Sequence, residues 1–515
     1  MKTLVCYFRN KPTCSQRIYY MTDKTKSHFD IIVIGGGPSG YAAAMRAIDF
    51  GKSVCLIEKN KLGGAGAYNG ALASKTMWEF SNSIKNARRN GFSPNFTWEK
   101  VSQTVNEALV TWAFNLSFQI KMLKEVSEKA CFVYERGIGT LVSPNDVKII
   151  KKNEERTISG DHIILATGST PRRIPSIDID EKVILTSDGI FHMEDFPESI
   201  VILGAGVIGC EFATIFANFG KTKVHIIDKQ DRILPFEDED MSKLVTDNLE
   251  AMGVKVHKNS QLSRMEKKNG KVEFEIQFRD GRKESITVEK ALISIGRVPN
   301  SRGLGLEALG IEISERGHVV DDDTKTAVHS IHAVGDLSGH IALVNVGELE
   351  GRQAIEKIYG ENVKKLTYRN ISSIMFLEPE VAAVGMNEQE ARKNNISHKV
   401  VKLDYSTIGR AIAMGKTEGF FKIIVTDDDE MKVLGMRACG AHASSAIQGV
   451  SLLIEMDKSI MELDNLIHPH PSIIEGVQEC VRMLNGSPIF KSSIFTDKIK
   501  CYSWTNGVET PLHVV

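Results

Sequence analysis

The sequence predicts an α/β fold with two doubly wound, mostly parallel sheets and a third, α+β domain. The first observation behind this prediction is a unit of strand, glycine-rich turn, helix and second strand that begins at residue 29. The second is that the same unit returns from residue 199. The third is a pair of apolar runs around an acidic turn at residues 419–436, which is typical of antiparallel strands.

The first unit opens with an apolar run over residues 29–34, which has the length and composition of a buried strand. It leads directly into the turn Gly-Gly-Gly-Pro-Ser-Gly at residues 35–40. A helical pattern follows over residues 41–50, and a second apolar strand over residues 53–57 ends in Glu58.

The second unit repeats this order. Residues 199–203 lead into Gly-Ala-Gly-Val-Ile-Gly at residues 204–209, a helix follows, and the strand at residues 223–227 ends in Asp228. The acid lies 18 residues after the third glycine of the turn in the first unit and 19 in the second. One such turn is a weak signal, but two copies with the same flanking elements and a terminal acid predict dinucleotide-binding units.

The spacing of the glycines has a physical reason. The first allows a tight turn, the second lets the backbone approach a pyrophosphate, and the third lets helix and strand pack closely, while the acid accepts hydrogen bonds from a ribose. Two dinucleotides in one chain imply electron transfer between them. We expect contacts with them at Gly35, Gly37, Gly40 and Glu58 in the first unit, and at Gly204, Gly206, Gly209 and Asp228 in the second.

The composition is that of an ordinary globular protein, with 42% hydrophobic and 25% charged residues. The net charge of −1 gives no support for binding to nucleic acid or to a membrane surface, and no apolar run is long enough to span a bilayer. The eight cysteines include no C-x-x-C pair, which indicates reduced thiols rather than a disulfide framework. No metal site is predicted.

The N-terminal 28 residues precede the first strand and have a different composition. Residues 1–22 carry four basic residues and no acid. This composition is typical of an organelle transit peptide and predicts a mitochondrial location. The alternative is a cytoplasmic chain with a disordered tail, for which Met21 is a possible internal start.

Other elements follow from periodicity and turn residues. Helices are expected over residues 74–89 and 98–129, and strands over residues 419–425 and 432–436. A short strand at residues 163–166 ends in a turn at Thr167 and Gly168, followed by prolines that suggest a crossing between domains. The second helix is predicted to bury a stripe of Leu109, Trp112, Phe114, Leu116, Ile120 and Leu123.

From residue 29 to about residue 488 the chain resembles the pyridine nucleotide–disulfide oxidoreductase family, in particular its dihydrolipoamide dehydrogenase-like and soluble transhydrogenase-like members. The segments that carry this resemblance stand in family order. They are the two glycine turns, Ala-Thr-Gly at residues 166–168, Glu-Phe-Ala at 211–213, Gly-Arg-Val-Pro-Asn at 296–300, Ala-Val-Gly-Asp at 333–336, Glu-Pro-Glu-Val-Ala-Ala-Val-Gly at 378–385 and His-Pro-His-Pro-Ser-Ile-Ile-Glu at 468–475.

The resemblance implies FAD in the first unit and NAD in the second. A carboxylate at Asp228 repels a 2′-phosphate and so favours NAD over NADP, although Lys229 and Arg232 nearby oppose this preference. Lys75 and Glu211 are expected to form an ion pair beside the flavin. Further cofactor contacts are implied at Thr167, Gly168, Gly296, Arg297, Gly335 and Asp336.

The resemblance also implies a proton relay made by His470 and Glu475, in which the carboxylate fixes the tautomer of the imidazole. In the family this pair reaches the site from the partner subunit, so the chain is expected to act as a homodimer. His468 is interpreted as structural.

The redox-active segment departs from the family pattern. Where the resemblance implies two thiols, at residues 66 and 71, this chain has Gly66 and Ala71, and neither can form a thiolate or a disulfide. Ala73 replaces a usual proline, and Asn345 stands where many relatives have histidine. Cys210 is expected to be a buried, inert thiol.

Three interpretations remain open. The chain is an FAD enzyme that oxidises NADH and passes electrons directly to a quinone, a dye, oxygen or a second nicotinamide; it is a structural or regulatory subunit of a larger complex; or it is a disulfide reductase that uses other cysteines. The expected domains are an N-terminal extension (1–28), an FAD domain (29–178), an NAD domain (179–303), a return segment to the FAD domain (304–370), a dimerisation domain (371–490) and a tail (491–515).

Overall fold

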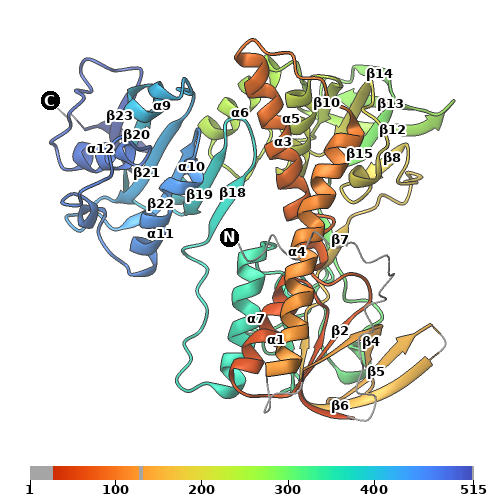
Figure 1. The fold of residues 1–515 in the computed structure, drawn as a ribbon. Helices are drawn as coiled ribbons and strands as arrows, with labels where there is room; N and C mark the ends of the chain where they lie inside the picture. The colour runs from red at the N-terminus through yellow and green to blue at the C-terminus, as the bar shows by residue number, and fades with distance from the viewer. Residues whose placement is uncertain (1–26, 127–131, 153, 513–515) are drawn as a thin grey trace, which may run out of the picture.

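The computed structural model describes residues 27–126, 132–152 and 154–512, so the predicted transit peptide lies outside the described residues except for its last two. Figure 1 shows the chain as three bodies, each formed around its own sheet. Within the part of the chain described, no helix is both long and apolar enough to cross a membrane.

The first body contains a sheet in the order β3-β2-β1-β6-β5-β4, in which β1 lies parallel to both β2 and β6. β17 returns late in the chain and pairs in parallel with β6, and α7 packs on α1 (Figure 1). The strands are β1 (His28–Ile34), β2 (Val54–Glu58), β3 (Phe132–Arg136), β4 (Ile138–Leu141), β5 (Asp146–Lys151), β6 (Glu154–Leu165) and β17 (Ile331–Ala333). The helices of this body are α1 (Pro38–Asp49), α2 (Gly64–Ala67) and α7 (Val344–Tyr359). Helices α3 (Ala71–Arg89) and α4 (Trp98–Val126) run between this body and the second, where α3 packs on α5 (Val207–Phe219).

The second body is a parallel sheet in the order β11-β10-β9-β15-β8, beside an antiparallel sheet of β12, β13 and β14. A short antiparallel pair, β7 with β16, lies where the chain passes between the first two bodies. The elements are β7 (Ser169–Pro171), β8 (Ile184–Thr186), β9 (Ser199–Leu203), α5 (Val207–Phe219), β10 (Lys223–Ile227), α6 (Glu239–Ala251), β11 (Lys255–His257), β12 (Ser260–Lys268), β13 (Lys271–Phe278), β14 (Lys283–Val288), β15 (Lys290–Ile293) and β16 (Arg297–Pro299).

The third body is an antiparallel sheet in the order β18-β19-β22-β21-β20-β23-β24. The two strands predicted around the acidic turn are confirmed as β21 and β22, which pair with each other. The elements are β18 (Ser372–Met375), β19 (Val381–Gly385), α8 (Glu388–Lys393), β20 (His398–Asp404), α9 (Gly409–Ala413), β21 (Phe420–Thr426), β22 (Val433–Cys439), α10 (Ala443–Ala446), α11 (Gln448–Glu455), α12 (Glu475–Leu484), β23 (Ile499–Thr505) and β24 (Val508–Pro511).

The prediction of a separate tail after residue 490 is wrong. β23 pairs antiparallel with β20, and β24 extends the sheet by one more strand. The apolar side chains of Ile499, Cys501 and Trp504 in β23 are buried. Their burial against the third body explains why these residues continue the sheet.

The predicted buried stripe of the 98–129 helix is only partly correct. Leu116 and Ile120 are buried, but Phe114 is 65% and Trp112 46% exposed. Because each residue turns an α-helix by about 100°, Phe114 points about 200° away from Leu116. Phe114 instead stacks on the exposed ring of Phe118, one turn further along the same outer face.

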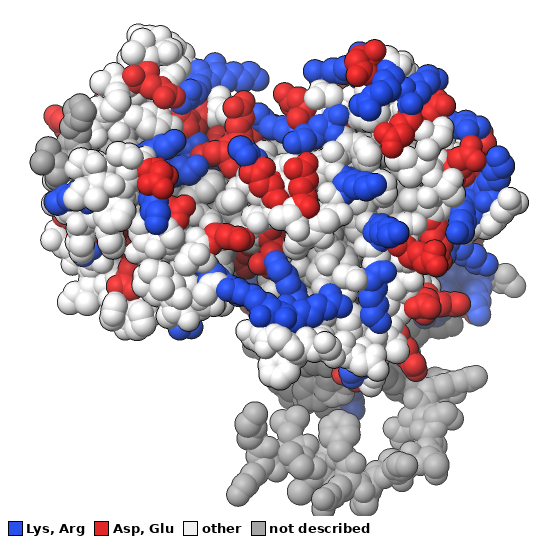
Figure 2. All heavy atoms as spheres, turned by 90° about the horizontal axis from the view of Figure 1, so that it is seen from above, with Lys and Arg blue, Asp and Glu red and all other residues white. Residues whose placement is uncertain are grey.

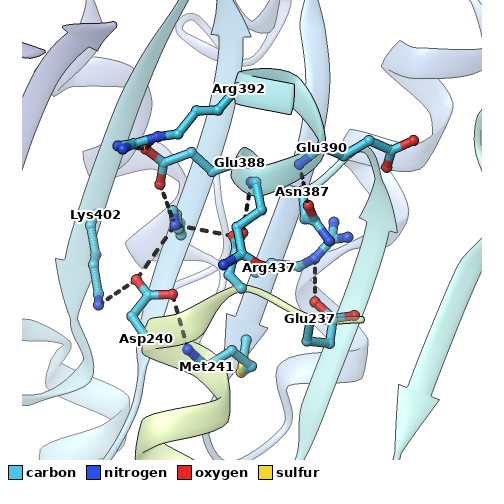
Figure 3. Close-up of polar contacts among 12 residues, drawn as sticks. Glu237, Asp240, Met241, Asn387, Glu388, Glu390, Arg392, Lys402 and Arg437 are labelled. Carbon is cyan, nitrogen blue, oxygen red and sulfur yellow. Dashed lines mark hydrogen bonds and ion pairs between the residues drawn. The ribbon is translucent and has the colours of Figure 1, made fainter. Parts of the chain in front are cut away.

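Charged residues of both signs are interspersed on the face of the molecule shown in Figure 2. A buried set of charges joins the second and third bodies (Figure 3). The ammonium group of Lys422 lies 3.0 Å from Asp238, 3.5 Å from Asp240 and 2.5 Å from Glu388. Arg437 donates to Glu237 at 2.8 Å.

The buried charges stabilise one another in the folded state. Burial alone would raise the pKa of Glu388, but hydrogen bonds and nearby positive charges, Lys422 among them, outweigh it and hold that pKa well below its usual range. The pKa of Asp240 is lowered by the same balance. Since these folded-state pKa values are lower than in the unfolded chain, their contribution is present at neutral pH and is lost as the pH falls below about 4.

We predict that Lys422→Ala destabilises the protein by about 3–5 kcal/mol, because it leaves buried carboxylates without a counter-ion. Lys432→Ala is the matched control, since Lys432 also contacts two carboxylates, at 3.0 and 3.1 Å, but at the surface. The control should change stability by less than about 1 kcal/mol. Urea unfolding followed by circular dichroism measures both, and equal midpoints for the two variants would contradict the expectation.

Candidate active site

The first glycine turn joins β1 to α1 and has the geometry that its spacing predicts. A Cβ atom on Gly35 would lie 2.2 Å from the carbonyl oxygen of Ala166, and one on Gly40 would lie 1.9 Å from that of Gly35. These two positions therefore exclude any side chain. Apart from Gly37 itself and its two chain neighbours, no described residue has an atom within 4 Å of a Cβ placed on Gly37, so this glycine faces open space at the N-terminus of α1.

The second glycine turn, between β9 and α5, has the same arrangement. A Cβ on Gly204 would lie 2.7 Å from the carbonyl oxygen of Ser294, and one on Gly209 would lie 2.0 Å from that of Gly204. Gly206, at the N-terminus of α5, again has no described atom within 4 Å of its Cβ position. Both turns thus leave a backbone cradle beside a helix N-terminus, which suits a pyrophosphate.

The two terminal acids hold the turns from the neighbouring strands. Glu58 accepts a hydrogen bond from the backbone N–H of Gly36 at 2.7 Å, and Asp228 accepts one from the backbone N–H of Ala205 at 2.7 Å. An ionised carboxylate has acceptor sites beyond these bonds, so each acid can also accept from a ribose hydroxyl. The predicted positions of both acids beside their turns are found in the structure.

Arg232, which the sequence places near a possible 2′-phosphate, is committed elsewhere. Its guanidinium contacts Glu239 at 3.1 Å and donates to Gln389 of the third body at 2.7 Å. It also donates to the carbonyl oxygens of Pro235 and Glu237. Because these bonds occupy the Arg232 guanidinium, Arg232 no longer opposes a preference for NAD, and of the two nearby cations only Lys229 still does.

Three segments implied as cofactor contacts meet at Ser169, a residue that the sequence analysis did not single out. Its hydroxyl donates to Asp336 at 2.5 Å, and the guanidinium of Arg297 donates to its hydroxyl and its carbonyl oxygen, both at 2.7 Å. The signal for Ser169 was its place directly after the Thr167–Gly168 turn.

The neighbouring backbone fixes this assembly. Thr167 donates to the carbonyl oxygen of Asn300, whose own N–H donates to Gly168. Gly168, Gly296 and Gly335 all have positive φ angles, of +66°, +102° and +70°, a region that favours glycine. A Cβ on Gly335 would lie 2.4 Å from the hydroxyl of Ser39, so the segment with Asp336 lies directly against the first glycine turn.

Lys75 and Glu211 form the ion pair that the resemblance implied. The Lys75 ammonium group, on α3, lies 2.7 and 2.8 Å from the two carboxylate oxygens of Glu211, on α5. Glu211 is buried, while the side chain of Lys75 is partly exposed. The pair therefore joins the first body to the second beside the segment that starts α3.

The segment at residues 62–71 folds closely over the first glycine turn. The N–H of Gly63 donates to the carbonyl oxygen of Gly36 at 2.8 Å. A Cβ on Gly66 would lie 2.4 Å from Cγ of the Pro38 ring, which is closer than real Cβ atoms approach. This loop conformation accommodates glycine at residue 66, and a Cβ atom there would require Pro38 or the loop to shift.

His470 and Glu475 lie together in the third body, far along the chain from the glycine turns. The imidazole Nδ1 lies 2.8 Å from a Glu475 oxygen, and the His470 side chain is 77% exposed. Burial alone would raise the pKa of Glu475, but the hydrogen bonds from His470 and from the backbone of Ser472 lower it. The imidazole of this pair therefore lies at the surface of the chain.

The cysteines of the described residues are Cys55, Cys210, Cys439, Cys480 and Cys501, and all are buried. Burial raises the pKa of the Cys210 thiol well above its ordinary value, and its sulfur lies 3.4 Å from the carbonyl oxygen of Ala205. A thiol kept protonated in this way is a poor nucleophile. The described residues also contain no cluster of potential metal ligands.

The chain is similar to known proteins over most of its length. Residues 29–351 match the family described as pyridine nucleotide-disulphide oxidoreductase, and residues 371–481 match the dimerisation domain of that family. Two dihydrolipoyl dehydrogenases of Bacillus subtilis are 32% and 33% identical to the chain over 479 and 469 residues. These alignments cover 90% and 89% of this chain and 99% and 97% of the relatives.

Two solved structures have a similar fold. The crystal structure of LpdA from Mycobacterium tuberculosis has a TM-score of 0.81 and 26% identity, and the match covers 88% of this chain and 99% of LpdA. The Cu(II) complex of the HOCl-induced flavoprotein disulfide reductase RclA from Escherichia coli has a TM-score of 0.79 and 25% identity, with 89% and 99% covered.

The fold, the two cradles and these matches define an FAD- and NAD(H)-dependent oxidoreductase. The chain belongs to the pyridine nucleotide–disulphide oxidoreductase family, and its dimerisation domain supports formation of a homodimer. The predicted family, fold class and cofactors are confirmed.

We predict that Gly37→Val abolishes FAD binding, because a side chain would fill the open space beside the first turn. Gly206→Val is the paired variant: it should retain FAD and lose reduction by NADH. Flavin absorbance after purification with added FAD, and its bleaching by NADH without oxygen, distinguish the two. Retention of FAD by Gly37→Val would contradict the assignment of the first cradle.

We also predict that NADH is preferred to NADPH, and that Asp228→Ala narrows the preference about tenfold by removing charge repulsion. Asp231→Ala is the control, since it removes an exposed acid three residues along the same turn. Steady-state kcat/KM with both nucleotides measures the effect. Equal or better use of NADPH by the unmodified protein would overturn the assignment.

Proposed function

We propose that this protein oxidises NADH and passes the electrons through FAD directly to a small-molecule acceptor, without a protein dithiol. The acceptor is a quinone, a dye, oxygen or a second nicotinamide. The observation that carries the proposal is Gly66, because the loop that holds it packs against Pro38 where a cysteine side chain would need room. The burial of every cysteine in the described residues supports it further.

The bound FAD would supply two-electron chemistry, which the protein itself does not provide. With a quinone as acceptor, NADH, one proton and the quinone give NAD⁺ and the hydroquinone, so electrons and protons balance. Gly37 and Glu58 would hold FAD, and Gly206 and Asp228 would hold the nicotinamide dinucleotide. Ser169, Arg297 and Asp336 would line the flavin side of the same site.

The Lys75–Glu211 pair would order the site between the two cofactors. Its members come from different domains, so it would also help to set how closely the two nucleotide cradles approach each other. His470 and Glu475, supplied by the partner subunit, would hold a proton beside the acceptor. Because no thiol would need a proton, the His470–Glu475 pair would contribute less to the reaction rate than the Lys75–Glu211 pair.

The composition of residues 1–22 supports a separate proposal, that the segment up to residue 28 directs the chain to mitochondria. Import of the chain with and without this segment into isolated mitochondria tests it. Uptake that does not depend on the segment would contradict the proposal.

The acceptor distinguishes the proposed enzyme from its alternatives. We predict that NADH-dependent reduction of a benzoquinone or a dye is readily measured, whereas lipoamide and glutathione disulfide are not reduced. Lys75→Ala should slow flavin reduction by at least about tenfold, since the buried Glu211 carboxylate loses its partner. His470→Ala should change quinone reduction less than about twofold.

Two outcomes would contradict the proposal. Robust turnover of lipoamide would instead support the interpretation that the chain is a disulfide reductase that uses other cysteines. Failure of NADH to reduce the bound FAD would instead favour a structural or regulatory subunit, which should co-purify with a larger complex whether or not Lys75 is replaced.

A further inference from the structure

One residue of the third body reaches the Lys75–Glu211 ion pair. Phe376 directly follows β18, and its backbone N–H donates to a Glu211 carboxylate oxygen at 3.1 Å. Its ring lies under the Lys75 ammonium group, 4.9 Å from the nitrogen to the ring centroid. Phe376 therefore contacts both members of the pair, one through its backbone and the other through its ring.

The segment around Phe376 is firmly held against α3. The Phe376 ring packs edge-to-face on Trp78, with the ring centroids 5.3 Å apart. The neighbouring residues Met375 and Leu377 are buried in the same apolar cluster as Trp78. A salt bridge of 3.3 Å between Glu378 and Lys85 fixes the segment one step further along. The position of the ring thus follows from contacts on both sides of it.

We propose that Phe376 is a positioning residue for electron transfer, through which the dimerisation domain sets the geometry of the Lys75–Glu211 pair. The inference rests on the proposed function, since that is where the pair acts. The negative face of the ring attracts the ammonium group, and the N–H of Phe376 satisfies one oxygen of the buried Glu211 carboxylate. Together these contacts fix the direction of both charged groups.

The ring face is the part of Phe376 that a substitution can isolate. Leucine keeps the backbone N–H and most of the buried apolar volume but has no aromatic face, whereas tyrosine retains the ring. A cation–π contact at a partly buried site contributes enough for about a tenfold change in rate when it is lost. Phe80→Leu is a matched control, because Phe80 is partly buried against the same apolar cluster and its ring packs edge-to-face on Phe96.

The test compares the holoenzyme with Phe376→Leu, Phe376→Tyr and Phe80→Leu in two measurements. The first is anaerobic stopped-flow reduction of the flavin over a range of NADH concentrations. Phe376→Leu should lower the limiting rate about tenfold with little change in the NADH concentration for half-saturation, while Phe376→Tyr and Phe80→Leu stay within about twofold. Phe376→Leu at the unmodified rate, or Phe376→Tyr as slow as Phe376→Leu, would overturn the inference.

The second measurement needs neither NADH nor turnover. Acylation of lysines by an activated ester, mapped by mass spectrometry, reports how firmly the Lys75 amine is held. Phe376→Leu should increase labelling of Lys75 severalfold, while Phe376→Tyr and Phe80→Leu should not; unchanged labelling in Phe376→Leu would contradict the inference. If NADH does not reduce the unmodified protein, the proposed function fails, and this labelling alone decides the role of Phe376.

Discussion

The ion pair between Lys75 and Glu211 is the interaction on which the arrangement of the candidate site depends. Lys75 comes from the first body and Glu211 from the second, and Phe376, which contacts both, comes from the third. Since the carboxylate is buried, the pair must be maintained: a buried charge that loses its partner is strongly destabilising. The same contacts that balance this charge therefore hold the three bodies together beside the two cradles.

A second constraint on the site is that particular positions must be glycine. Gly35 and Gly40 admit no Cβ because backbone atoms occupy the space, whereas Gly37 faces an open cradle. Gly66 belongs to the first kind, although its neighbour is the ring of Pro38 rather than backbone. The loop that holds Gly66 lies against Pro38, while both glycine turns keep the backbone geometry that their spacing predicts.

The parts of the fold that could be predicted are those encoded locally. The glycine turns and their terminal acids depend on short sequence spacing, and the structure shows both acids hydrogen-bonded to their turns. The Lys75–Glu211 and His470–Glu475 pairs required the family resemblance, because their residues carry no local pattern. Phe376 and the strand at residues 499–505 were missed since their roles arise only from tertiary contacts. Phe114 was misplaced because apolar character alone does not say which helix face is buried.

The measurement that tests the central claim most directly is an anaerobic reductive titration of the purified flavoprotein with NADH or dithionite. A protein with FAD and a redox-active dithiol accepts two pairs of electrons, whereas FAD alone accepts one. We predict complete bleaching of the flavin after one two-electron equivalent per FAD, with no long-wavelength band from a thiolate beside the flavin. Uptake of two equivalents, or the appearance of that band, would contradict it.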